Sequence, residues 1–69
     1  MRTFRMEDVE RIEKLLANNK TVEIEWHTPY EKGNKVEIVK CVRWDGLVFT
    51  TGECVFTGID KLVAIKEIA

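Results

Sequence analysis

The chain has 69 residues, of which 45% are hydrophobic and only one is a proline. This length leaves room for one small core and excludes a second domain, so residues 1–69 are expected to form a single domain. Eleven basic residues against twelve acidic ones give a net charge of −1, which excludes a strong overall attraction to nucleic acid or to an anionic membrane. No run of residues reaches the roughly 18 apolar positions of a membrane span, and the charged N-terminal segment lacks the apolar core of a secretory signal, so a cytoplasmic protein is expected.

The first predicted element is an amphipathic helix over residues 6–18. Its apolar residues recur at helical spacing and form one face: Val9, Ile12, Leu15 and Leu16. Acidic residues crowd the first turns, where they interact favourably with the positive end of the helix dipole. Thr3 is a candidate N-cap, and Asn18 with Asn19 is expected to end the helix.

The remainder, residues 21–68, is predicted to be sheet, because twelve of its residues are Val or Ile and β-branched side chains favour a pleated surface. Val22, Ile24 and Trp26 alternate with polar residues, which predicts a strand with one buried face. Residues 29–35 carry the only proline and a Gly-Asn pair, so they are predicted to form a loop that is longer than a tight hairpin needs and could serve recognition.

The strand predicted over residues 35–44 loses its alternation at residues 39–42, as a bulge or a sharp bend would require. Asp45-Gly46 then predicts a turn, followed by a hairpin of short strands at residues 47–51 and 54–57. Residues 58–69 fit either a helix or a strand, and a helical turn at residues 59–61 followed by a strand is favoured. The predicted fold class is α+β, with an N-terminal helix followed by a strongly bent antiparallel sheet of about five strands.

This order of elements resembles the Sm/SH3-like small barrels. The stretches that carry the resemblance are VEIEW, KVEIVKCVRWDG, LVFTT, CVFT and the isoleucine-punctuated GIDKLVAIKEI. Among these barrels the chain looks most like the bacterial YolD-like and WYL-type domains, in which a helix precedes a strand with a central aromatic. The Trp-Tyr-Leu signature of the WYL family is absent, so the resemblance implies no binding residue; it implies a regulatory or accessory role, often with nucleic acid.

Residues that could carry catalysis or hold a metal are few. His27 is the only histidine, and its place in the polar phase of a strand is more typical of a solvated or loop-capping imidazole than of a general base. Cys41 and Cys54 stand among Val, Phe and Ile, so they are expected to be buried, reduced thiols. No Cys or His spacing suits zinc, and the single glycines form no phosphate-binding loop. The chain is therefore expected to have no catalytic residue, metal or cofactor, and not to be an enzyme.

Binding is the function that the aromatic residues favour. Trp26 and Phe56 fit inward-facing phases, whereas Tyr30 lies in the predicted loop and Trp44 at a turn, so the latter two are expected to be partly exposed. Basic side chains lie near them in the sequence: Lys32, Lys35, Lys40 and Arg43. The leading hypothesis is a protein-binding module, such as a phage or bacterial regulator or inhibitor, that uses these six residues. The alternatives are a nucleic-acid-binding small barrel and an oligomer-forming unit that pairs through a free sheet edge.

Overall fold

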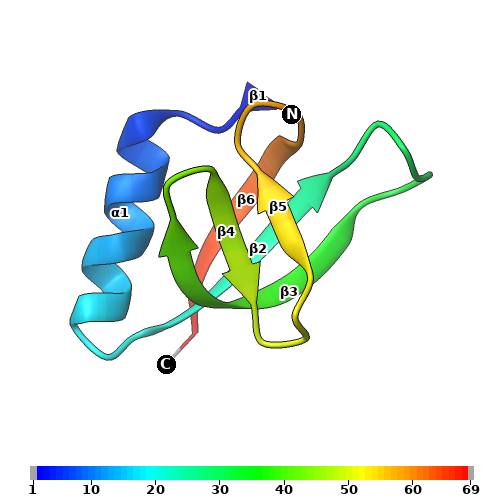
Figure 1. The fold of residues 1–69 in the computed structure, drawn as a ribbon. Helices are drawn as coiled ribbons and strands as arrows, with labels where there is room; N and C mark the ends of the chain where they lie inside the picture. The colour runs from blue at the N-terminus through cyan, green and yellow to red at the C-terminus, as the bar shows by residue number, and fades with distance from the viewer. Residues whose placement is uncertain (1, 69) are drawn as a thin grey trace.

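A computed structural model describes residues 2–68, and Met1 and Ala69 lie outside the described part. The elements follow in the order β1 (Arg2–Thr3), α1 (Met6–Ala17), β2 (Thr21–His27), β3 (Lys35–Arg43), β4 (Gly46–Phe49), β5 (Cys54–Phe56) and β6 (Lys61–Ile68). The strands form an antiparallel sheet in the order β1-β6-β2-β3-β4-β5, and α1 lies beside it (Figure 1). The predicted α+β class is confirmed, and α1 precedes every strand of the sheet except the two-residue β1. No helix within residues 2–68 is long and apolar enough to cross a membrane.

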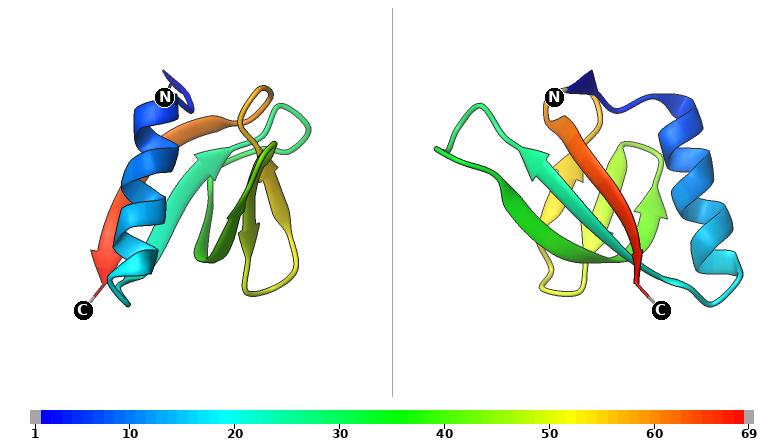
Figure 2. Two further views of the ribbon diagram at one scale, coloured as in Figure 1. Left: turned by 60° about the vertical axis from the view of Figure 1, so that its left-hand side comes forward. Right: turned by 180° about the vertical axis from the view of Figure 1, so that it is seen from behind.

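The sheet bends at β3, which takes part in both of its halves. Residues 35–38 of β3 pair with β2, residues 39–43 pair with β4, and the register shifts between Val39 and Cys41. Lys40 is the extra residue of this bulge, which confirms the bend predicted from the broken alternation. Figure 2 shows β4 and β5 facing β2 and β6 across the bend. The outermost strands of the described residues, β1 and β5, do not pair with each other, so the sheet is strongly curved but not closed.

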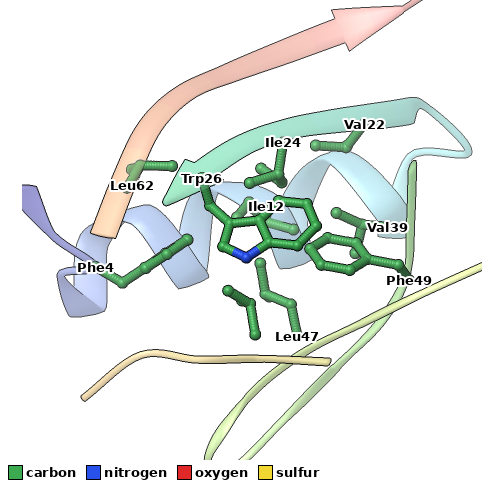
Figure 3. Close-up of a cluster of buried hydrophobic side chains, with 10 residues drawn as sticks. Phe4, Ile12, Val22, Ile24, Trp26, Val39, Leu47, Phe49 and Leu62 are labelled. Atoms are coloured by element: carbon green, nitrogen blue, oxygen red, sulfur yellow. The ribbon is translucent and has the colours of Figure 1, made fainter. Parts of the chain in front are cut away.

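The core fills the space between the two halves of the bent sheet and α1 (Figure 3). Trp26 from β2 stacks on Phe49 from β4, with ring centroids 4.5 Å apart and ring planes at 26°, so the two halves meet at an aromatic pair. Ile12 of α1 is fully buried, and the predicted inward alternation of β2 is confirmed. The buried hydrophobic residues are Phe4, Ile12, Val22, Ile24, Trp26, Val39, Leu47, Phe49, Val55 and Leu62.

The two ends of α1 differ in how well the sequence predicts them. Arg5 is the N-cap residue, and its backbone N–H donates a hydrogen bond of 2.8 Å to Oδ2 of the buried Asp8. Thr3 belongs to β1, so the predicted Thr3 cap is wrong; an acidic side chain in the first turn takes the capping role instead. At the other end Asn18 is the C-cap and Asn19 adopts a φ of 60°, which confirms the predicted end.

The predicted burial of three side chains is wrong. Cys41 and Cys54 are both exposed and form no disulfide, and Phe56 is 46% exposed. The reason is strand phase: the buried residue of β5 is Val55, so its two neighbours point outward. The bulge in β3 likewise turns Cys41 to the outer face, where it pairs in register with Val48, the residue that Cys54 also faces.

The segment after β5 makes one turn before the last strand. The N–H groups of Ile59 and Asp60 donate to the carbonyl oxygen of Phe56 at 3.0 and 2.9 Å, which is helix-like bonding confined to one turn over residues 57–60. β6 then pairs with β2 along its length. The favoured alternative for the C-terminal segment, a turn followed by a strand, is confirmed.

Candidate functional site

The predicted binding residues lie on two separate grooves. Trp44 and Arg43 line a groove between α1 and the β3–β4 turn, here called the Trp44 groove. Tyr30 and Lys35 line a groove between the β2–β3 loop and β5, here called the Tyr30 groove. Trp44 is 92% and Tyr30 is 80% exposed, so their predicted exposure is confirmed, but the structure does not bring them together. Two further predicted residues are exposed and line neither groove: Lys32 and Lys40.

The Trp44 groove, with a volume of about 520 Å³, has one wall from α1 and one from the sheet. Met6, Val9 and Glu13 lie at helical spacing on one face of α1 and form the first wall. The lining as a whole consists of Phe4, Arg5, Met6, Val9, Glu13, Val42, Arg43, Trp44 and Thr57. Met6 is 78% exposed, so both walls of the groove carry a large apolar side chain that no part of the described chain covers.

Most charges around the Trp44 groove are already paired. Nη1 of Arg5 lies 3.3 Å from Oε1 of Glu7, and Nε of Arg43 lies 3.6 Å from Oδ1 of Asp45. Glu13 has no ion pair within residues 2–68. Exposed ion pairs of this kind contribute little energy, so the groove offers both polar and apolar surface for contact with a ligand.

The Tyr30 groove has a volume of about 420 Å³. Its lining consists of Thr28, Tyr30, Glu31, Lys35, Glu53, Cys54, Phe56, Ile59 and Asp60. Three of these are exposed hydrophobic side chains from three different segments: Tyr30 from the β2–β3 loop, Phe56 from β5, and Ile59 from the following turn. Exposed apolar side chains that gather in one hollow, rather than scatter singly, indicate a binding surface.

The charge of the Tyr30 groove is negative. Nζ of Lys35 lies 2.8 Å from Oε2 of Glu31 and 3.0 Å from Oε2 of Glu53. Hydrogen bonds to these carboxylates, Glu31 foremost, raise the pKa of Lys35 above its usual value and tie the β2–β3 loop to the β4–β5 turn. Asp60 also lines the groove, so the lining includes one lysine and three carboxylates, with a formal charge of −2. The sequence around Tyr30, with its lysines, does not indicate this negative charge, because Glu53 and Asp60 come close to the β2–β3 loop only in the folded sheet.

The free edge of β5 is partly closed by the chain itself. The carbonyl oxygen of Glu53 accepts the N–H of Phe49 at 2.9 Å, and the N–H of Thr57 donates to the carbonyl oxygen of Asp45 at 3.2 Å. Because both bonds run toward β4 and its preceding turn, alternation directs the N–H and C=O groups of Cys54 and Phe56 to the free edge. The N–H of Phe56 donates to Oδ2 of Asp60 at 2.8 Å, and its carbonyl accepts two N–H groups of the next turn. Only the backbone groups of Cys54 are left open along β5.

His27 fixes the loop that carries Tyr30. Its Nδ1 lies 3.0 Å from the carbonyl oxygen of Gly33, and because a carbonyl only accepts, Nδ1 must carry the hydrogen and donate it. The side-chain amide of Asn34 donates to Glu25 at 3.1 Å. The loop-capping interpretation of His27 is confirmed. Within residues 2–68 there is no group of three or more His, Cys, Asp or Glu residues that could hold a metal ion.

Comparisons with protein-family models, with curated proteins and with solved structures found no significant match to this chain. The resemblance to the YolD-like and WYL-type domains therefore stays a prediction.

Proposed function

We propose that the chain is a non-enzymatic protein-binding module that holds its partner in the Trp44 groove. The observation that supports this is the exposure of Trp44 and Met6 on the two walls of one hollow. Tryptophan is enriched among the residues that dominate the energy of protein interfaces, because it buries a large rigid surface at a low cost in side-chain entropy. A hollow that combines large apolar side chains with paired charges suits a protein partner that presents both apolar and polar groups.

The charges favour a protein over a nucleic acid as the partner. A groove for single-stranded nucleic acid needs unpaired basic side chains beside its aromatics. Arg5 and Arg43 at the Trp44 groove are each paired with a carboxylate, and the Tyr30 groove is acidic. The third hypothesis, an oligomer formed through a sheet edge, is disfavoured at β5 because Asp60 occupies the N–H of Phe56.

The bent sheet is proposed to be an open small barrel of the SH3/Sm type. This proposal is supported by the strand order β6-β2-β3-β4-β5, by a β3 that serves both halves of the sheet, and by the single turn before the last strand. A barrel that is open beside α1 leaves room for the Trp44 groove between the helix and the β3–β4 turn.

The experiment is to capture and identify a partner, and then to measure its affinity for variants by calorimetry. The Met6→Ala, Trp44→Ala double variant should bind at least about tenfold more weakly, because truncation of a residue that dominates an interface costs about 2 kcal/mol or more and about 1.4 kcal/mol is tenfold. Both side chains are exposed, so circular dichroism should show an unchanged fold. Tyr30→Ala is the matched control, since it removes an equally exposed aromatic from the other groove. The proposal is wrong if the double variant binds the identified partner as tightly as the wild type does.

A further inference from the structure

The apolar part of the Tyr30 groove has no covering element within the described residues. Tyr30 is 80%, Phe56 46% and Ile59 45% exposed, and all three line the same hollow. They come from a loop, a strand and a turn, so no single amphipathic element explains their exposure. The groove therefore presents a contiguous apolar surface to a ligand.

Two carboxylates of the same groove each have an oxygen atom that no described residue bonds. Lys35 occupies only Oε2 of Glu31 and Oε2 of Glu53, and no other residue of the described chain bonds the second oxygen of either carboxylate. The two carboxyl groups are about half exposed, at 53% and 48%. A guanidinium or ammonium group can therefore bind them without displacing Lys35, and its charge complements the two negative charges that remain in the groove.

The edge of β5 determines how a ligand backbone would lie. Cys54 lines the groove and presents an unpaired N–H and C=O at the free edge, whereas Phe56 is closed by Asp60. An extended segment can thus form two backbone hydrogen bonds with Cys54, but it cannot pair with β5 as a full strand. The groove accordingly suits a short extended segment.

None of these contacts involves the Trp44 groove. We infer that the Tyr30 groove is a second binding surface, and that it takes a short, extended peptide segment that carries basic and apolar side chains on the same face, at every second position. The apolar residues pack on Tyr30, Phe56 and Ile59, and the basic residues bind the free carboxylate oxygens beside Lys35.

The test uses a synthetic peptide, Ser-Gly-Val-Ser-Arg-Ser-Val-Gly-Ser, whose Val and Arg residues share one face when the peptide is extended, and a counterpart in which Glu replaces Arg. Alkylation of the two native thiols is followed by mass spectrometry. The basic peptide should slow alkylation of Cys54, which lines the groove, and leave alkylation of Cys41 unchanged, because that thiol lies two strands away on β3. The acidic peptide should protect neither thiol.

Variants separate charge at the groove from charge in general. Glu53→Lys should weaken binding of the basic peptide about fivefold, which is the upper end of the range for one exposed ion pair. Glu53→Gln should give a smaller loss in the same direction, without placing a second ammonium group beside Lys35. The matched control is Glu10→Lys, which makes the same charge change on the exposed part of α1 and should leave binding unchanged.

Three results would overturn the inference: equal protection by both peptides, protection of Cys54 by neither at millimolar concentration, or an equal loss in the Glu10→Lys control. The Met6→Ala, Trp44→Ala variant keeps the two proposals distinguishable. It should retain peptide protection of Cys54 whether or not the Trp44 groove binds a protein, and loss of protection in that variant would place the peptide in the wrong groove.

Discussion

Replacement of Asp60 by alanine tests the closure of the β5 edge. Asp60 is 4% exposed, and its Oδ2 accepts the N–H of Phe56 at 2.8 Å. A hydrogen bond to a charged group contributes about 1.5–3 kcal/mol, and its loss leaves that N–H without its partner. Asp60→Ala should therefore lower the free energy of unfolding by about 2 kcal/mol, which for a domain of this size is a fall of roughly 10 °C in Tm.

The assay is urea unfolding followed by tryptophan fluorescence, since Trp26 is buried against Phe49. Asp60→Asn is the control: its amide oxygen can still accept from Phe56, so it should recover part of the loss. Light scattering should show more self-association for Asp60→Ala than for the wild type at equal concentration, because an opened edge can pair with another strand. The reasoning is refuted if Asp60→Ala and Asp60→Asn both stay within about 0.5 kcal/mol of the wild type and neither associates.

Three further predictions follow from the sheet and its ion pairs. Gly46→Ala should lower the free energy of unfolding by about 1–3 kcal/mol or more, because the added Cβ would overlap the backbone of β5. Gly58→Ala, where a Cβ meets nothing, should be close to neutral in the same urea assay, and equal losses for the two variants would contradict this. Ion pairing raises the pKa of Lys35, so the contribution of Lys35 to stability is complete below pH 10.5 and is lost as pH rises through the folded-state pKa. The Tm values of wild type and Lys35→Met should therefore converge as pH rises beyond 10.5, and a constant difference would count against the pairing. Both Cys41 and Cys54 should react with thiol reagents, yet mild oxidation should give no intramolecular disulfide by mass spectrometry, because two strand spacings separate them by roughly 9–10 Å.

The sequence predicts the elements whose signal is local. The alternation of Val22, Ile24 and Trp26 predicts β2 and its buried face, because a side chain's face in a strand depends only on its position within that strand. The break in alternation after Val39 predicts the bend for the same reason. The bend brings β5 round to the β2–β3 loop and so forms the Tyr30 groove.

The phase of short strands is harder to predict. β5 has three residues, and a run of Cys54, Val55 and Phe56 offers no polar residue to mark its outer face. All three residues are apolar enough for a core, and only the pairing with β4 buries the middle one. The predicted burial of Cys41 is wrong for a related reason. The sequence shows that a bulge is present but not which residue the bulge turns outward.

The exposed aromatics were predictable, but their grouping was not. Tyr30 and Trp44 stand in a loop and a turn, where a side chain rarely finds a core. Tyr30 and Trp44 occupy different grooves because the register of β3 with β2 and with β4 keeps the β2–β3 loop and the β3–β4 turn apart. The acidity of the Tyr30 groove also depends on tertiary pairing, because Glu53 and Asp60 reach the groove from the β4–β5 hairpin and the turn after it.

The turn over residues 57–60 holds the two grooves in a fixed relation. Thr57 lines the Trp44 groove and Ile59 lines the Tyr30 groove, so one short segment contributes to both. The N–H of Thr57 donates to the carbonyl of Asp45 at 3.2 Å, which ties this turn to the turn that carries Trp44. Asp60 and the carbonyl of Phe56 hold its other end. With these hydrogen bonds in place, a shift of the segment toward one groove would break bonds that hold the other.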